Sequence, residues 1–413
     1  MQHDQEAAGL KQWEKGFVVT ALLIIIYIAF ISLGLPDSVL GSAWPVIRLD
    51  LSAPVSLVGY VAMTISAGTV VSSLLSNRMV ARFGTAKVTT VSVLMTAVGL
   101  VGYSLAGQAA WLFLWAIPLG LGAGSVDAAL NNFVALHYKS MHMNWLHCFW
   151  GVGATAGPII MSFFLANGRG WRTGYGVIAG LQFALVLVLF ASLRLWQGRD
   201  QAAGSKDGGS PVVSNREALG VPLVKLALVS FACFSITEAT TGLWSSSYLV
   251  GVHGMAPAAA ARWTASFYGG ITVGRLLSGF LSMKLKNAAL IRGGQLVCVA
   301  GAVLLMLPVP VQLSACGIVL IGLGTAPIFP AMLHETPNRF GAAASGAIMG
   351  LQMAVAYAGG TLGSPLFGFL ASVTSLNLLP YYVLAAVVTM LAASELLNGR
   401  LEGRRPVWMT GKN

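Results

Sequence analysis

Three acidic residues lie inside long apolar stretches of this sequence: Asp37, Asp127 and Glu238. A charge in the hydrocarbon core of a membrane costs at least about 2.5–3.5 kcal/mol, and residues that bear it usually mark a substrate or proton pathway. A carboxyl group there can carry a proton, and its oxygens can accept hydrogen bonds from hydroxyl groups. We interpret all three as candidate proton-coupling residues, and Asp37 and Glu238 also as candidate substrate contacts. The alternative for Asp127 is a helix-packing role, bonded to a neighbouring Ser or Asn, and the alternative for Asp37 is a structural role at a helix kink near the outer face.

The composition indicates a chain that is embedded in a membrane. Its 413 residues are 56% hydrophobic and 9% charged, with a mean hydropathy of +0.77, which is too apolar for a soluble globular protein. About twelve stretches reach the roughly 20 residues that a membrane-spanning helix needs. They run approximately over 16–44, 53–78, 87–107, 110–137, 144–167, 174–196, 222–250, 260–283, 290–308, 311–333, 342–371 and 376–397. We therefore predict an all-α membrane protein with about twelve transmembrane helices.

A long polar segment, residues 198–220, separates the apolar stretches into two equal sets. Its Gly, Ser and charged residues predict a flexible linker between an N-terminal six-helix bundle (1–197) and a C-terminal six-helix bundle (221–413). Most Lys and Arg residues fall on the side of the membrane that holds this linker and both termini, which predicts that this side is cytoplasmic. The net charge of +11 then follows from topology and predicts no nucleic-acid partner.

Other residues in the apolar stretches could complete a binding site with the three acids. Asn131 follows Asp127 by four positions and can share its helix face, and Trp244 follows Glu238 and could cover the apolar side of a sugar. Arg275 is either a gating residue or the ion-pair partner of Glu238. The remaining candidate substrate contacts are His147, Trp150, Tyr268, Gln352 and Tyr357. Each could equally bond a neighbouring helix, and His147 could also relay protons.

The sequence lacks the motifs that are typical of ATP binding, metal binding and enzyme catalysis. No GxxxxGK[ST] loop is present to hold the phosphates of ATP. The six histidines and four cysteines show no metal-ligand spacing, and no nucleophile and base are clustered as in an enzyme. We therefore expect a transporter that is not an enzyme and needs no metal and no cofactor beyond a proton gradient.

Several segments resemble a known family of transporters. Five of them are LPDSVLG (35–41), SVDAALNNFVALHY (125–138), NWLHCFWGVGATAGP (144–158), TEATTGLWSSSYL (237–249) and GTAPIFP (324–330). In this order they resemble the fucose-permease-type sugar:proton symporters of the major facilitator superfamily. The loop NRMVARFGTAK (77–87) resembles the superfamily's GxxxDRxGRK signature, which implies a gating role for Arg82. Ala81 stands where that signature has an acidic residue.

The resemblance implies two six-helix bundles that alternate in opening to the two sides of the membrane. Together with the acidic residues, it predicts proton-coupled uptake of a neutral sugar or sugar-like polyol, with Asp127 as the proton carrier. The alternative is a proton-coupled exporter of drugs or metabolites. The expected partners are a hydroxylated small molecule, protons and the lipid bilayer, and the expected functional unit is a monomer. The resemblance also implies a bacterial inner membrane, with both termini cytoplasmic.

Overall fold

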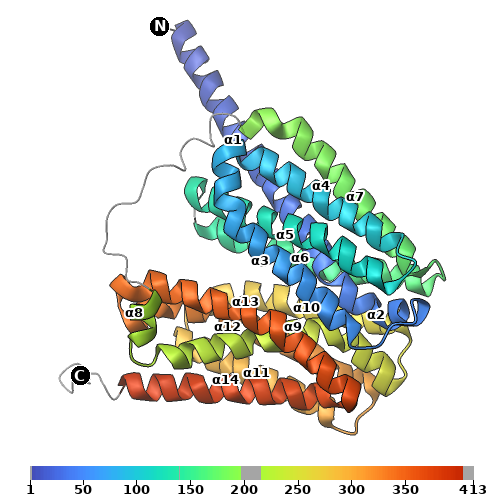
Figure 1. Ribbon diagram of the computed structural model, residues 1–413. Helices are drawn as coiled ribbons and strands as arrows, with labels where there is room; N and C mark the ends of the chain where they lie inside the picture. Colours follow the sequence, from blue (N-terminus) through green and yellow to red (C-terminus); the bar gives the residue numbers. More distant parts are fainter. Residues whose placement is uncertain (1, 139, 197–214, 403–413) are drawn as a thin grey trace.

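The chain folds entirely into helices wherever its structure is described. The computed structural model describes residues 2–138, 140–196 and 215–402, and these residues contain no β-strand (Figure 1). Eleven helical segments of this part are long and apolar enough to cross a membrane. In a bilayer every backbone group must be satisfied within the protein, which a helix does by itself. The prediction of an all-α, multi-pass membrane fold is confirmed.

The first group of helices comes from the N-terminal half of the chain. Its members are α1 (Gln2–Asp37), α2 (Val39–Asp50), α3 (Leu57–Phe83), α4 (Thr85–Ser104), α5 (Ala109–His137), α6 (Ser140–Ala166), α7 (Gly170–Ser192) and the short η1 (Leu193–Trp196). Within it, α5 packs against α3 and α4, α1 packs against α6, and α4 packs against α7. The first predicted span is divided at Ser38, where α1 ends beside Pro36 and α2 continues to Asp50.

The second group comes from the C-terminal half. Its members are α8 (Asn215–Gly220), α9 (Val224–His253), α10 (Pro257–Leu281), α11 (Asn287–Met306), α12 (Val311–Phe340), α13 (Ala342–Val373), η3 (Leu376–Leu378) and α14 (Leu379–Glu402). Although α10 is not among the eleven most apolar segments, it is 25 residues long and packs against α6, α9 and α12. Residues 198–214 of the predicted linker lie outside the described residues, and 215–220 form α8.

The two groups meet at one end of the molecule. There the Ser246 hydroxyl donates to the Ser42 carbonyl at 2.9 Å, and the Ser162 hydroxyl donates to the Ala258 carbonyl at 2.7 Å. These bonds join α9 to α2 and α6 to α10, close to the α2–α3 and α9–α10 loops. Figure 1 shows the groups diverging toward the opposite end, where α8, the start of α1 and the end of α14 lie. We call the joined end the closed end.

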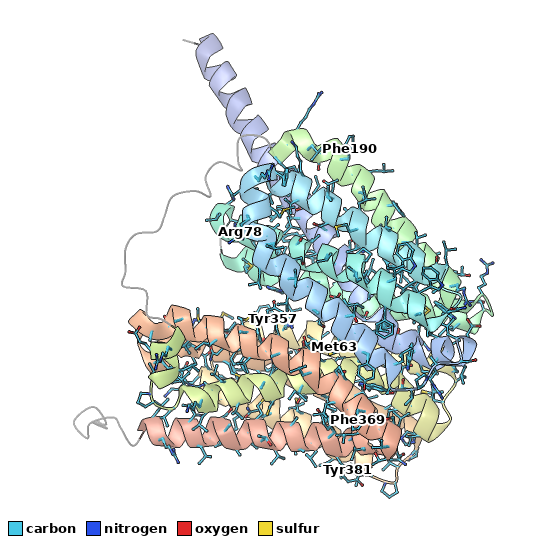
Figure 2. All side chains as sticks on the ribbon, in the orientation of Figure 1. Met63, Arg78, Phe190, Tyr357, Phe369 and Tyr381 are labelled. Carbon is cyan, nitrogen blue, oxygen red and sulfur yellow. The ribbon has the colours of Figure 1, made fainter. Side chains whose placement is uncertain are left out.

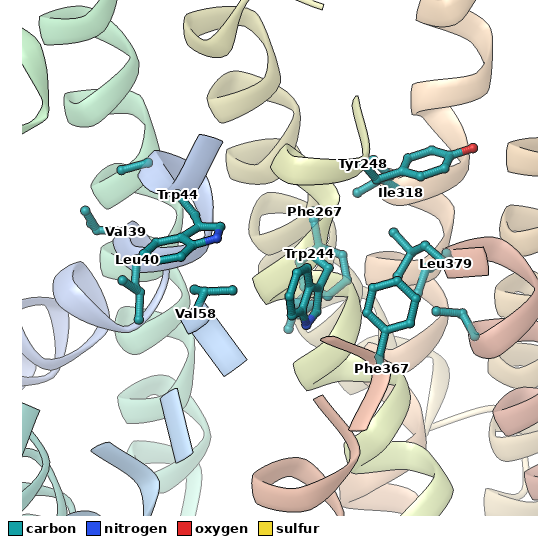
Figure 3. Close-up of a cluster of buried hydrophobic side chains, with 14 of the residues drawn as sticks. Val39, Leu40, Trp44, Val58, Trp244, Tyr248, Phe267, Ile318, Phe367 and Leu379 are labelled. Carbon is teal, nitrogen blue, oxygen red and sulfur yellow. The ribbon is translucent and has the colours of Figure 1, made fainter. Parts of the chain in front are cut away.

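Large apolar side chains fill both groups near the closed end. Figure 3 shows Trp44 beside Val39, Leu40 and Val58 in the first group, and Trp244 beside Phe367 in the second. Both indoles are fully buried, and each donates a hydrogen bond, Trp44 to the Val55 carbonyl at 2.9 Å. Between helices in a bilayer, van der Waals packing and hydrogen bonds of this kind provide the stabilisation, since lipid is as apolar as the side chains themselves. This end therefore holds the helices at fixed positions around the site.

Close backbone approach between α3 and α5 predicts a large effect of a bulky side chain there. Gly120 of α5 faces the backbone of Ile65 with no room for a Cβ atom. We expect Gly120→Leu to push the two helices apart and to abolish the monodisperse peak in fluorescence-detected size-exclusion chromatography, because overpacking a tight contact costs about 1–3 kcal/mol or more. Gly176→Leu is the matched control, since nothing lies within 4 Å of that position. Equal behaviour of the two variants would contradict the close α3–α5 contact.

Candidate functional site

A cavity of about 830 Å³ lies between the two groups of helices. Helices α1, α3, α5 and α6 of the first group and α9, α10, α12 and α13 of the second contribute to its wall. Figure 2 shows Met63 of α3 and Tyr357 of α13 on this inner side, whereas Phe190 and Tyr381 lie on outer faces. The predicted site residues that line the cavity are Asp37, Asp127, Asn131, His147, Trp150, Glu238, Tyr268, Arg275 and Tyr357.

Asp37 is the last residue of α1 and is held by α6. The Trp150 indole Nε1 donates a hydrogen bond to Asp37 Oδ2 at 2.8 Å. This contact needs α1 and α6 to lie close together, and Gly34 of α1 meets the Trp150 backbone with no room for a side chain. The bond fixes one carboxylate oxygen of Asp37, whose side chain lines the cavity.

Asp127 and Asn131 form a second unit on α5. The Asn131 amide Nδ2 donates to Asp127 Oδ1 at 2.9 Å, one helical turn away, as the spacing predicted. The amide oxygen Oδ1 of Asn131 is buried and has no hydrogen-bond partner among the described residues. Both side chains line the cavity from one face of α5.

Glu238 of α9 and Arg275 of α10 face each other across the second group's side of the cavity. Their closest oxygen and nitrogen atoms are 4.0 Å apart, and their side chains are 24% and 20% exposed. The guanidinium carbon of Arg275 lies 5.4 Å from the ring centroid of Trp150, a cation–π distance. Arg275 thus lies between Glu238 of one group and the Trp150–Asp37 pair of the other. Both interpretations of Glu238, as cavity contact and as ion-pair partner, remain compatible with this geometry.

Trp244 does not line the cavity, contrary to the prediction. It is fully buried, and its Nε1 donates to the carbonyl and the hydroxyl of Ser364, both at 3.1 Å. Its ring packs on Phe367 with centroids 5.2 Å apart. On an α-helix, a residue six positions after Glu238 points about 120° away from it, so Trp244 lies on a different face of α9. Trp244 therefore ties α9 to α13 within the second group.

Gln352 and Arg82 also lie outside the cavity. Gln352 is 2% exposed, and its Oε1 accepts a hydrogen bond from Thr336 Oγ1 at 2.9 Å, so it joins α13 to α12. Arg82 is exposed near the end of α3, where its guanidinium lies 5.3 Å from the Phe83 ring centroid. Among the described residues no acidic side chain is within ion-pair distance of Arg82. Its gating role stays a prediction.

The sequence reasoning missed a polar stripe on α3. Ser66, Thr69 and Ser73 line the cavity, and their spacing of three and four residues places them on one helix face. The hydroxyls of Thr69 and Ser73 donate to the Gly120 and Gly124 carbonyls of α5 at 3.2 and 3.1 Å. Three hydroxyl residues at helical spacing inside the predicted span 53–78 would have indicated this stripe from the sequence alone.

The cavity contains acids but no metal-binding arrangement in the part of the chain that is described. No group of three or more His, Cys, Asp or Glu side chains there is placed to hold a metal ion. The cavity can accept hydrogen bonds through its three acids and donate them through Tyr268, Tyr357 and Ser66. It therefore has the chemistry to bind a small polar molecule and to hold a proton.

Comparison with known proteins places this architecture among transporters. The family model described as Major Facilitator Superfamily matches residues 26–364. An uncharacterized MFS-type transporter of Yersinia pestis is 23% identical, with 90% of this chain and 94% of the relative covered. An uncharacterized transporter of Sinorhizobium fredii, y4wD, is 25% identical, over 81% of this chain and 87% of that protein.

Two solved structures have the same fold. The nucleoside transporter NupG has a TM-score of 0.75 at 12% identity, with 90% of this chain and 98% of NupG covered. A bacterial homologue of the human lysosomal transporter Spinster, in an inward-facing and unoccupied conformation, has a TM-score of 0.67 at 16% identity, with 94% and 95% covered. At these identities the likeness concerns the fold alone.

Proposed function

Because the chain belongs to the Major Facilitator Superfamily and is a multi-pass membrane transporter, we propose that it couples uptake of a neutral sugar or sugar-like polyol to proton influx. The observation that carries the proposal is the charge pattern of the central cavity. Three acids line it, and among its described lining residues Arg275 is the one Arg or Lys side chain. A negatively charged substrate would be repelled by such a wall, whereas hydroxyl groups can donate hydrogen bonds to it.

The rest of the lining supports a hydroxylated substrate. Asn131 and the α3 residues Ser66 and Thr69 add hydrogen-bonding atoms on the first group's side. Trp150 and Tyr268, whose ring centroids are 6.5 Å apart, add aromatic surface for the apolar side of a sugar ring. This combination supports the fucose-permease-type branch as the nearest functional class.

Proton coupling is assigned to Asp127, with Asp37 and Glu238 in binding or coupling. In this proposal the protonated carrier binds the sugar from outside, and the two groups of helices then close over it at the outer side and open inward. Loss of the proton from Asp127 to the cytoplasm accompanies sugar release. The closed end is then the outer end, and the diverging end, with both termini, is cytoplasmic. We place the protein in a bacterial inner membrane, working as a monomer.

An apolar part of the wall favours the alternative function. Its residues are Leu33, Met63, Phe234, Phe329, Leu333 and Met353. Such a surface suits an apolar drug or metabolite and would serve a proton-coupled exporter. The two functions differ in direction: an importer takes up protons with the sugar from outside, and an exporter exchanges external protons for an internal substrate.

A pH measurement on cells tests the proposal. Deenergised, weakly buffered cells that express the protein receive a panel of sugars and polyols, and the external pH is recorded. Alkalinisation with one compound, absent from cells without the protein, is the expected result. No pH change with any compound, together with raised drug resistance of the same cells, would overturn uptake and establish the exporter.

The Trp150–Asp37 hydrogen bond gives a prediction for the same assay. Trp150→Phe keeps an aromatic ring and removes the donor to Asp37. A hydrogen bond to a charged group contributes about 1.5–3 kcal/mol, so we expect the initial rate of alkalinisation to fall about tenfold or more. Trp145→Phe on the same helix is the control, because Trp145 is half exposed and does not line the cavity. Equal rates in both variants would show that the bond to Asp37 has no role in transport.

A further inference from the structure

The two walls of the central cavity differ in polarity in the half that lies nearer the diverging end. From the closed end, α3 leads away, α4 returns and α5 leads away again, so the later residues of α5 lie in this half (Figure 1). By the same alternation, this half contains the first turns of α6, the first part of α9 and α13, and the later part of α12. The lining residues of these segments therefore lie at a similar depth and can be compared.

The first group's wall is polar at this depth. We call Ser73 of α3, Asp127 and Asn131 of α5 and His147 of α6 the polar face, and all four line the cavity. Together they bring a hydroxyl, a carboxyl group, an amide and an imidazole to this side. Ser73 donates its proton to a backbone carbonyl of α5 at 3.1 Å and keeps its oxygen as an acceptor. Leu33 of α1 is the large apolar side chain that this group adds to the same half.

The second group's wall is apolar at the same depth. We call Phe234 of α9, Phe329 and Leu333 of α12 and Met353 of α13 the apolar face, and all four line the cavity. The rings of Phe234 and Phe329 pack with centroids 5.7 Å apart, so residues of two helices form one surface. Ser235 of α9 is the hydroxyl residue that adjoins this face in the sequence and also lines the cavity.

The charged side chains that the second group adds to the described lining are not part of the apolar face. Glu238 and Arg275 approach each other to 4.0 Å, and the Arg275 guanidinium also lies 5.4 Å from the Trp150 ring centroid. These residues therefore belong with the Trp150–Asp37 pair. In the proposed function, that part of the cavity contacts the hydroxyl groups of the substrate.

A ligand that fills the cavity meets both faces. A free sugar carries hydroxyl groups on all sides, and those directed at the apolar face would exchange water for a wall with few hydrogen-bonding groups, which costs free energy. A wholly apolar molecule would displace water from the polar face and leave its carboxyl group and imidazole without partners. A molecule with a hydroxylated part and an apolar part satisfies both walls at once.

The cavity also has room for such a molecule. Its volume of about 830 Å³ lies in the upper part of the range of about 300–1,000 Å³ in which pockets enclose drug-sized ligands. The part around Asp37, Trp150 and Tyr268 can hold a sugar ring, as proposed above. The half with the two faces then remains for a second part of the substrate.

We propose that the substrate is a sugar or polyol that carries an apolar substituent of about the size of a phenyl ring, as an aryl glycoside does. Its hydroxyl groups bind the acids and the polar face, and its substituent packs on the apolar face. This inference rests on the proposed function for the hydroxylated part of the substrate and adds the substituent. It also gives the apolar part of the wall a role in an importer.

Ligand-induced thermal stabilisation of the full chain in lipid nanodiscs tests the inference. The probes are the methyl and phenyl glycosides of the same sugars, and phenol, which lacks a sugar. A ligand that binds the folded state stabilises it in proportion to its affinity and concentration, so a titration yields the dissociation constant. Binding in this assay requires neither a proton gradient nor transport.

We expect the phenyl glycoside of at least one sugar to bind about ten- to a hundredfold more tightly than its methyl glycoside, as burial of one ring away from water predicts. Phenol should bind more weakly than that phenyl glycoside. Equal affinities of the phenyl and methyl glycosides, equal binding of phenol, or no binding of any phenyl glycoside would overturn the inference.

Two variants locate the substituent. Leu333→Asn and Met353→Gln keep the approximate side-chain size and make the apolar face polar. We expect each to weaken binding of the phenyl glycoside about tenfold and to leave the methyl glycoside unchanged. Leu285→Asn and Met283→Gln are the matched controls, since both residues are exposed outside the cavity, and should keep the full preference for the phenyl glycoside.

An undiminished preference for the phenyl glycoside in both Leu333→Asn and Met353→Gln would overturn the assignment of the apolar face. The failure of the proposed function is a separate result. If the unmodified protein gives no pH change with any sugar or glycoside, proton-coupled uptake fails, and the affinities of the two glycosides still decide whether the cavity binds an apolar substituent.

Discussion

Replacing Asp127 with asparagine is expected to abolish sugar-induced proton uptake while leaving the fold intact. The amide oxygen of the introduced side chain can still accept the hydrogen bond that Asn131 donates to Asp127 at 2.9 Å, so the local geometry is kept and the exchangeable carboxyl proton is lost. Exchange of labelled sugar for unlabelled sugar needs no net proton movement and should persist. External pH and sugar exchange, recorded on the same cells, are the two measurements.

Glu395→Gln is the matched control for Asp127→Asn. Glu395 is also an acid in a helix, but it pairs with Arg292 outside the cavity, with both side chains over a third exposed. We expect this variant to alkalinise the medium as the unmodified protein does. Alkalinisation at the normal rate in Asp127→Asn would exclude Asp127 as the proton carrier.

Replacing Arg275 with methionine is expected to destabilise the protein and to stop transport. Methionine keeps much of the side-chain volume but removes the cation between Glu238 and Trp150. Oε2 of Glu238 already lacks a hydrogen-bond partner in the described structure, so the variant leaves a mostly buried acid without compensation. Loss of one partner of such a pair costs about 1–3 kcal/mol at this 4.0 Å separation.

Thermal unfolding and transport together separate the two roles of Arg275. We expect a lower melting temperature for Arg275→Met and a recovered one for the double variant Glu238→Gln, Arg275→Met, with transport absent from both. Arg292→Met removes the cation of the more exposed Arg292–Glu395 pair, where a surface ion pair contributes about 0–1 kcal/mol. A larger loss of stability in Arg292→Met than in Arg275→Met would contradict the account of the cavity pair.

The membrane fold could be predicted from the sequence because it depends on long-range composition. Apolar stretches of sufficient length must become helices in a bilayer, whatever their neighbours are. The ends of the helices could not be predicted from hydropathy, because a helix can continue through polar residues. One example is α12, which continues to Phe340, beyond the predicted end at 333. The break at Ser38 divides a span that was predicted as continuous, although a helix kink had been an alternative for Asp37.

The acids of the site could be found because a carboxylate in an apolar stretch is conspicuous. Their partners could not, since Trp150 lies 113 positions from Asp37 and only the α1–α6 contact brings them together. Trp244 and Gln352 were predicted as substrate contacts and lie outside the cavity. Both are polar or aromatic in apolar helices, but each is bonded to a neighbouring helix, and the sequence does not show which face of α9 or α13 meets the cavity.

Proton-driven accumulation of the sugar identified by the pH panel distinguishes proton-coupled uptake from facilitated diffusion and from export. Right-side-out membrane vesicles receive the labelled sugar under an interior-negative potential of about 100 mV, which contributes about 2.3 kcal/mol per proton and supports about 50-fold accumulation. We expect accumulation above the external concentration that collapses with a protonophore and is absent in Asp127→Asn. Equilibration without accumulation, or net movement of the sugar out of the vesicles, would contradict proton-coupled uptake.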